Sequence, residues 1–120
     1  MNKVTINLQT NKEEFYKAYL NSINGILKMK GTELTVLYHF MNIKAERNTD
    51  KVVTSVTRKE VQKLMNTTPF NLNNYIKRLK DIKALVPNDD GSFNINPKLF
   101  FPISTSTITL VFNINDWLPN

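Results

Sequence analysis

The chain contains no cysteine, three glycines and one histidine among its 120 residues. Without cysteine it has no disulfide bond, no thiolate metal site and no cysteine nucleophile. The glycines, Gly25, Gly31 and Gly91, lie too far apart to form a glycine-rich phosphate loop. The sequence also lacks the run of roughly 20 apolar residues that a membrane span needs, and its first residues do not resemble a secretory signal. We therefore expect a cytoplasmic protein without a membrane partner.

The residues that usually carry catalysis are also scarce. His39 lies next to the apolar side of its expected helix, where a packed or surface histidine is more common than a catalytic one. Asp89 and Asp90 form a carboxylate pair, but a hairpin turn accounts for both of them. No spacing typical of metal ligands is found. The sequence argues against an enzyme, and we expect no catalytic residues, no cofactor and no metal site.

The net charge of +6 is concentrated in one segment. Residues 51–83 carry a balance of +6, whereas residues 1–50 carry +2 and residues 84–120 carry −2. A basic segment of this kind is typical of proteins that bind polyanions such as nucleic acid, and a solvated basic surface without a partner is the alternative. Its basic residues are Lys51, Arg58, Lys59, Lys63, Lys77, Arg78, Lys80 and Lys83.

Length and patterning predict one domain of the α+β class over residues 1–120. Its expected parts are an N-terminal strand and helix over 1–31, a core over 32–103, and a C-terminal strand and tail over 104–120. Alternating apolar residues predict strands over 4–8 and 109–114, and these strands are able to pair.

The helices of the first half have recognisable ends. The first is expected from Thr10 or Asn11 to about Met29, with Gly31 ending it and Asn24-Gly25 as a point where it can break. The second is expected to begin at Thr32 and Glu33 and to be followed by a loop over 46–51. Its predicted apolar stripe consists of Leu34, Leu37, Tyr38, Met41 and Ala45.

Two capped helices are predicted next. Thr57 and Glu60 fit a capping box, after a short strand containing Val52, Val53 and Val56, and the buried side of this helix is expected at Val61, Leu64 and Met65. Thr68 caps the following helix, with Pro69 at the first helical position, where no N–H is needed. The apolar stripe of that helix consists of Leu72, Tyr75, Ile76, Leu79 and Ile82.

Strand-like residues 84–86 and 92–95 flank a short polar loop that contains Asp90-Gly91, which predicts a β-hairpin. Helix, turn, helix and hairpin in this order form the core of a winged helix-turn-helix domain, and the hairpin is its wing. The same segment holds the positive charge. Together these features predict a protein that binds double-stranded DNA.

The predicted DNA contacts lie mainly on the second helix of the motif, because its N-terminal residues reach base edges in the major groove. Asn71, Asn74, Lys77 and Arg78 form the expected contact face, and Thr68 and Asn73 lie beside it. Asparagine pairs with adenine, and Lys or Arg with guanine or phosphate. The alternative is that these are ordinary solvent-exposed positions on an amphipathic helix.

Further phosphate contacts are expected around this helix. Thr57, Arg58 and Lys59 begin the preceding helix, where amides and basic side chains suit phosphate. Lys83 lies at the base of the wing. The acidic tip, residues 88–92, would be repelled by phosphates, so either the wing does not enter a minor groove or the orientation on DNA is unusual.

Two regions suggest protein partners. The N-terminal helix carries Phe15, Tyr16, Tyr19 and Leu20, more aromatic surface than one small domain must bury, and is a candidate dimer interface. Trp117 near the C-terminus packs on the core by default and is otherwise a candidate docking site for a partner.

Residues 34–101 resemble the winged-helix domains of plasmid and phage replication initiators of the RepL type and, more loosely, of bacterial winged-helix regulators. The resemblance rests on TELTVLYHF, VTRKEVQKLMNTTPFNLNNYIKRLKDIKALV and GSFNINPKLFF, and Asn96-Pro97 after the wing is its most particular part. In such proteins the helix that matches Pro69–Lys80 binds DNA. The resemblance implies this role for Asn71, Asn74, Lys77 and Arg78.

We therefore expect a non-catalytic DNA-binding protein, a replication initiator or a transcription regulator of a phage or plasmid, in a bacterial or phage-infected cell. The alternative is a winged helix that acts as a protein-interaction or structural module in a larger replication, transcription or virion assembly. The acidic wing and the hydrophobic ends of the chain favour this alternative.

Overall fold

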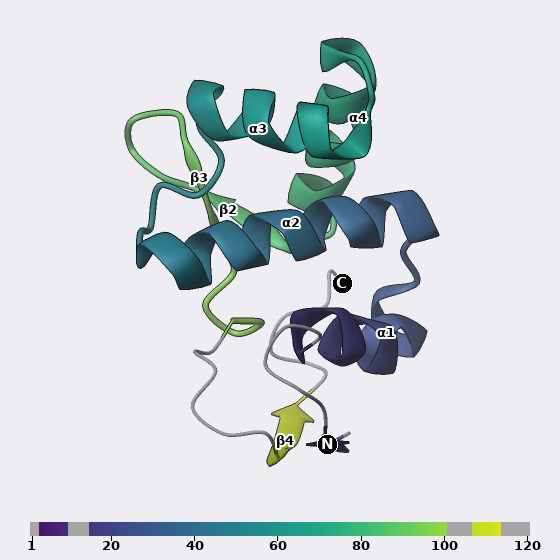
Figure 1. Cartoon of the computed structure of the whole chain (residues 1–120). Helices are drawn as coiled ribbons and strands as arrows, with labels where there is room; N and C mark the ends of the chain where they lie inside the picture. The colour runs from purple at the N-terminus through teal and green to yellow at the C-terminus, as the bar shows by residue number, and fades with distance from the viewer. Residues whose placement is uncertain (1–2, 10–14, 101–106, 114–120) are drawn as a thin grey trace.

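The computed structural model describes residues 3–9, 15–100 and 107–113 of the chain, and within these ranges the protein is of the α+β class. One strand precedes the helices and the remaining strands follow them, with the hairpin directly after the last helix (Figure 1). The elements are β1 (Lys3–Gln9), α1 (Phe15–Leu27), α2 (Gly31–Arg47), α3 (Ser55–Met65), α4 (Pro69–Asp81), β2 (Leu85–Pro87), β3 (Phe93–Ile95) and β4 (Thr107–Asn113).

Helix α2 is the centre of the fold, with α1 on one side and α3 and α4 on the other (Figure 1). Its buried residues surround much of the helix, because it packs against neighbours on two sides: Glu33, Leu34, Val36, Leu37, Phe40, Met41 and Ile43. Tyr38 is half-buried, whereas Ala45 is exposed, so the predicted stripe is wrong at its last position. The predicted loop over 46–51 is also wrong at its start, because the helix continues to Arg47.

The connection between α1 and α2 differs from the expectation that Gly31 ends the first helix. Helix α1 runs through Asn24-Gly25 and ends at Leu27, after which Lys28 adopts a φ of +54°. The amide side chain of Asn24 accepts from the N–H of Met29 at 2.9 Å and donates to its carbonyl at 3.2 Å. Gly31 is instead the first residue of α2. The predicted start at Thr10 or Asn11 lies outside the described residues.

The aromatic face of α1 is buried inside the chain. Tyr16, Tyr19 and Leu20 have almost no exposed surface, and the Tyr19 hydroxyl donates to the Leu99 carbonyl at 2.7 Å. The ring of Tyr16 stacks on that of Phe100, with 5.6 Å between the ring centroids. Burial raises the pKa of Tyr16 to about 12. These three side chains are therefore not surplus surface for a dimer, and the side chain of Phe15 lies outside the described residues.

The two end strands pair, as predicted from their alternating residues. Strands β1 and β4 are antiparallel, with Val4 opposite Phe112 and Ile6 opposite Leu110. Residues far apart in the sequence therefore form one two-stranded sheet. Trp117 lies outside the described residues.

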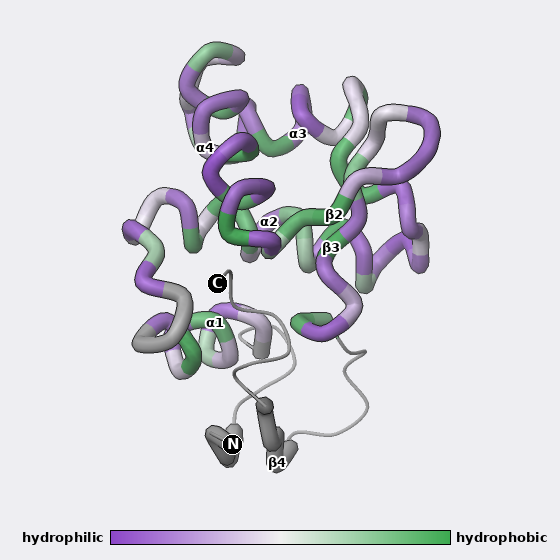
Figure 2. The backbone as a smooth tube through the Cα atoms, turned by 180° about the vertical axis from the view of Figure 1, so that it is seen from behind, coloured by the Kyte–Doolittle hydropathy of each residue, from purple (hydrophilic) through white to green (hydrophobic). Residues whose placement is uncertain are grey.

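The hairpin follows α4 and lies against the loop that precedes α3. Leu85 pairs with Ile95 in an antiparallel register, and Gly91 in the loop has a φ of +87°, which glycine adopts without a side-chain clash. The backbone of Val53 exchanges hydrogen bonds with Phe93, so the strand-like prediction is confirmed there. Val56 instead lies in the first turn of α3 and is 64% exposed. Figure 2, which views the molecule from behind, shows that β2 carries hydrophobic residues.

Candidate nucleic-acid interface

The start of α3 is fixed by a capping box one turn before the predicted one. The Thr54 hydroxyl accepts from the Thr57 N–H at 3.1 Å, and the Thr57 hydroxyl accepts from the Thr54 N–H at 2.8 Å. Thr57 also donates to the Val52 carbonyl at 2.7 Å. The predicted Thr57–Glu60 box is wrong. Thr54 is the N-cap, and the hydroxyl of Thr57, rather than the carboxylate of Glu60, accepts from the backbone N–H of the N-cap residue. Thr57 is buried, which removes it from the outer surface.

The turn and the start of α4 agree with the prediction from sequence. Asn66 ends α3 with a φ of +50°, and the Thr67 N–H donates to the Gln62 carbonyl at 3.1 Å. Thr68 then caps α4 by accepting from the Asn71 N–H at 3.1 Å, and Pro69 is the first helical residue. The chain therefore changes direction within three residues between the two helices.

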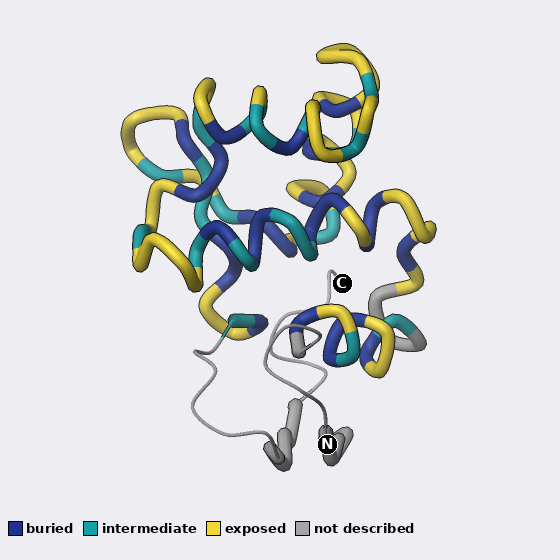
Figure 3. Tube along the Cα trace, viewed as in Figure 1, coloured by how far each residue is buried: buried dark blue, intermediate teal, exposed yellow. Residues whose placement is uncertain are grey.

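Helix α4 buries one stripe and leaves the opposite side exposed (Figure 3). Leu72, Ile76 and Leu79 face the core, as predicted. The exposed residues include every predicted contact on this helix: Asn71, Asn73, Asn74, Lys77 and Arg78. The side chains of Asn71, Asn73, Asn74 and Lys77 have no ion pair or side-chain hydrogen bond within the part of the chain that the structure describes. They are free to meet a ligand.

Arg78 differs from its neighbours because it is already paired. Its guanidinium donates to Glu33 of α2 at 2.9 Å, and the Glu33 side chain is 8% exposed while that of Arg78 is 55% exposed. A carboxylate in so dry a place requires a cation, since the unpaired charge would lose its hydration. Arg78 therefore holds α4 against the first turn of α2. The sequence pattern places Arg78 on the contact face and contains no sign of this partner.

The outer side of α3 carries two unpaired cations. Lys59 and Lys63 are exposed and have no carboxylate partner among the described residues. Glu60 lies between them but is bound by Arg47 of α2, with two hydrogen bonds of 2.8 and 2.9 Å. This bidentate pairing lowers the pKa of Glu60. Leu64, predicted to be buried, is exposed on this helix, so that prediction is wrong.

Arg58 of α3 lies beside the hairpin loop, residues 88–92. It is half-buried, and its Nε atom is buried without a hydrogen-bond partner among the described residues. Together with Ser55, Asp90 and Gly91 it lines a small hollow beside the N-terminus of α3. The free amides of a helix N-terminus and a guanidinium both favour an anion there.

One of the two carboxylates in the hairpin loop is neutralised by a nearby cation, which the acidic sequence of the loop does not indicate. Asp90 pairs with Lys51 at 3.3 Å and accepts hydrogen bonds from the amide and hydroxyl of Ser92. These bonds, led by the one from the Ser92 hydroxyl, lower the pKa of Asp90 to about 2. Asp50 in the neighbouring loop pairs with Lys44 at 3.1 Å. Asp89 is left exposed, without such a partner among the described residues.

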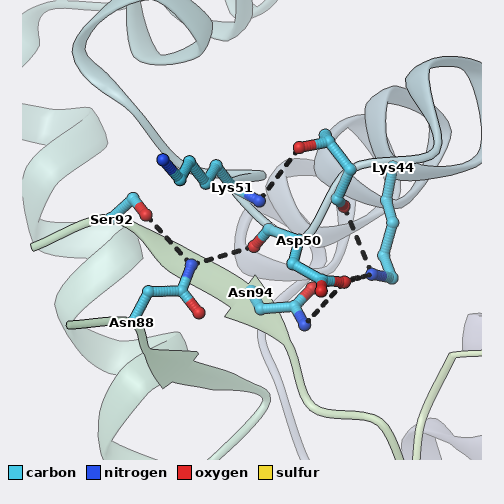
Figure 4. Close-up of polar contacts among 7 residues, drawn as sticks. Lys44, Asp50, Lys51, Asn88, Ser92 and Asn94 are labelled. Atoms are coloured by element: carbon cyan, nitrogen blue, oxygen red, sulfur yellow. Dashed lines mark hydrogen bonds and ion pairs between the residues drawn. The ribbon is translucent and has the colours of Figure 1, made fainter. Parts of the chain in front are cut away.

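A polar network attaches the hairpin to the end of α2 (Figure 4). Asn88 donates from its side-chain amide to the Asp50 carbonyl and to the Ser92 hydroxyl, both at 2.9 Å. Lys44 donates to the Asn94 side chain at 2.9 Å as well as to Asp50. The hairpin is therefore held in position by Lys44 of α2 and by Asp50 of the loop that follows α2.

Lys83 occupies the turn between α4 and β2, with a φ of +65° and an exposed side chain. Its carbonyl accepts from the amide group of buried Asn96 at 2.7 Å. Asn96 also donates its backbone N–H to Ala84 at 2.9 Å. The Asn96-Pro97 pair noted in the sequence thus has a structural role, because Asn96 ties the end of the hairpin to its beginning.

Phe70, which is absent from the predicted contacts, is 74% exposed, more than the other large apolar side chains in the described ranges. It is the second residue of α4 and so belongs to the same surface as the predicted contacts. The signal available in the sequence was its position: Phe70 lies two residues before Leu72 and is therefore out of phase with the buried stripe.

Other candidate sites are weaker. A groove between α1 and α2 is lined by residues that include Lys17, Tyr38 and His39, and partial burial lowers the pKa of His39. No group of acidic, histidine or cysteine side chains within the described residues is arranged to hold a metal ion. No helix in the described ranges is both long and apolar enough to cross a membrane.

Comparisons of the chain with protein-family models, with curated proteins and with solved structures found no significant match.

Proposed function

We propose that this chain has a winged helix-turn-helix fold and binds double-stranded DNA without catalysis, as a replication initiator or transcription regulator of a phage or plasmid. In this proposal α3, the turn and α4 form the helix-turn-helix, and the hairpin is the wing. The observation that carries the proposal is the outer side of α4, where amide and basic side chains are exposed without partners among the described residues. These side chains follow the helix start that Thr68 caps.

The charge distribution supports the same conclusion. Lys59 and Lys63 of α3 and Lys77 of α4 are exposed cations without carboxylate partners in the described part of the chain, and all three lie in the basic segment 51–83. Neutralising DNA phosphates releases condensed counterions, which supplies most of the sequence-independent affinity. The ion pair of Lys51 with Asp90 also lessens the repulsion expected between the wing tip and phosphates.

Each group of residues has a distinct role in this proposal. Arg58, at the hollow beside the α3 N-terminus, binds phosphate, as do Lys59 and Lys83 at the edges of the surface. Asn71, Asn73 and Asn74 meet base edges in the major groove, and Lys77 on the same face binds phosphate. Thr68 chiefly fixes the helix start. Arg78 contacts DNA only if it leaves Glu33, so it is a positioning residue here.

The test is binding of a mixed-sequence duplex measured by fluorescence anisotropy across a salt series. We expect micromolar or tighter binding at low salt and a steep loss of affinity with salt. Lys63→Ala with Lys77→Ala should reduce the slope of the log–log salt plot by about 0.9 for each phosphate that the variant no longer neutralises. The matched control is Lys17→Ala with Lys30→Ala, which removes the same charge from exposed residues elsewhere. Equal losses of affinity in both double variants would contradict the proposed surface.

A second candidate is a protein-interaction module, because three large apolar side chains, Val56, Leu64 and Phe70, are exposed on α3 and α4. Such residues are typical of protein contacts when they form a patch. Absence of DNA binding at low salt, together with a change of oligomeric state on Leu64→Ala or Phe70→Ala, would favour this candidate.

A further inference from the structure

The exposed ring of Phe70 lies in the first turn of α4, on the side of the helix that also carries Asn74 and Lys77. It is 74% exposed and forms no ring contact with other described aromatic residues. Leaving an aromatic ring in water is unfavourable, so its position calls for an apolar partner. On a helix whose exposed neighbours are amides and lysine, a second large apolar protein surface would have to bury those polar groups as well.

The major groove of DNA offers an apolar group within a polar surface. The C5-methyl group of thymine projects into this groove, beside the oxygen and nitrogen atoms of the base edges. Aromatic and other apolar side chains contact this methyl group, while asparagine pairs with the N6 and N7 atoms of adenine. An apolar ring surrounded by amides therefore matches an A·T-containing groove better than it matches an apolar protein.

The spacing along α4 fits this match. Phe70, Asn74 and Lys77 lie at positions i, i+4 and i+7, so they occupy one side of the helix. With a rise of about 1.5 Å per residue, Phe70 and Asn74 are about 6 Å apart along the helix axis. That is close to two base-pair steps of about 3.4 Å. With Phe70 on a thymine, Asn74 is therefore within reach of the base pair two steps away, where it can pair with an adenine.

We propose that Phe70 is a specificity-determining residue that contacts a thymine methyl group, with Asn71 or Asn74 on a nearby adenine, so that the chain prefers A·T steps. This inference rests on the proposed DNA-binding function and adds the base preference of the same surface. The lysines supply affinity for any sequence, and Phe70 supplies discrimination.

The test compares two A·T-rich duplexes of one sequence, one with thymine and one with deoxyuridine in its place. Deoxyuridine keeps the hydrogen-bonding edge of thymine and lacks only the methyl group. We expect the protein to bind the thymine duplex roughly fourfold more tightly for each methyl group contacted, from the free energy of burying one such group. Affinities are measured by anisotropy at fixed salt.

Three variants assign the effect. Phe70→Ala should bind both duplexes equally, and Phe70→Leu should keep part of the preference because it keeps an apolar contact. Leu64→Ala is the matched control, since Leu64 is 65% exposed on the neighbouring helix, and it should keep the full preference. Any effect of the methyl group on duplex shape would persist in Phe70→Ala, so an unchanged preference in that variant overturns the inference.

The outcomes separate this inference from the proposed function. Salt-dependent binding without a difference between the duplexes overturns the role of Phe70 and leaves DNA binding supported. No binding to either duplex overturns both. A wild-type chain that self-associates, with Phe70→Ala monomeric and its DNA affinity unchanged, would assign the ring to a second copy of this chain and also overturn the inference. Gel filtration with light scattering measures this last outcome.

Discussion

Helices α2 and α4 use their side chains in opposite ways. Both carry hydrophobic and polar residues, but α2 is buried on two sides, whereas α4 buries one stripe and exposes the rest. Phe40 of α2 has no exposed surface, and Phe70 of α4 is 74% exposed. The difference shows that composition alone does not decide the role of a helix here. Its neighbours do: α2 has helices on both sides, and α4 has them on one (Figure 1).

The largest expected effect on stability is that of Phe40→Ala, and Phe70→Ala is its comparison. Phe40→Ala removes a fully buried ring and should lower the free energy of unfolding by about 3–5 kcal/mol, through reduced apolar burial and the cavity left behind. Phe70→Ala should change it by less than about 0.5 kcal/mol. Urea unfolding followed by circular dichroism measures both. Similar losses of stability in the two variants would break the contrast between the helices.

The next effect concerns the ion pair that joins the helices. Arg78→Ala leaves the nearly buried Glu33 carboxylate without its cation and should cost about 1–2 kcal/mol of stability, a value kept low because Arg78 is itself half-exposed. Lys77→Ala, the adjacent control, should be nearly neutral. In a double-mutant cycle, the cost of Arg78→Ala should be much smaller in the Glu33→Gln background, where no carboxylate needs a cation. Additive costs would show that the two side chains are not coupled.

The helix starts provide a smaller test of the same comparison. Thr68 caps α4 with its hydroxyl, whereas Lys30, at the corresponding position of α2, makes no side-chain capping bond. Thr68→Ala should therefore cost about 1 kcal/mol, and Lys30→Ala almost nothing. Thermal unfolding measures both variants. A larger cost at Lys30 than at Thr68 would mean that capping does not fix the start of α4.

The smallest effect is the titration of Asp90 in the hairpin loop. Its pKa in the folded chain is about 2, below the ordinary value of 3.8, so its stabilising bonds are complete above about pH 4 and disappear as the pH falls through 2. Carboxyl chemical shifts measured by NMR should report this low pKa. Ser92→Ala should raise it, because the hydroxyl bond is the largest cause. An ordinary pKa in the unaltered chain would contradict the network around the loop.

Local patterns in the sequence determined much of the backbone. The cap and proline at the start of α4, its buried stripe, the hairpin and the two end strands all follow from residues a few positions apart or from simple alternation. Such signals are local because backbone geometry and the nearest amides generate them. The same patterns misplaced the start of α3, since they predicted Thr57 as the N-cap and Glu60 as its partner, whereas Thr54 is the N-cap and Thr57 is its partner.

Tertiary structure alone decided how the candidate surface is composed. The sequence pattern placed Arg78 on a free face, whereas packing places it against Glu33, 45 residues away. It indicated an acidic wing, whereas folding brings Lys51 to Asp90. It left Tyr16 and Tyr19 as surplus surface, whereas both are buried, with Tyr16 against Phe100 and the Tyr19 hydroxyl bonded to Leu99. In each case the residue that makes the contact is distant in the sequence, so no local pattern can predict it. The packing of the core brings the two residues together.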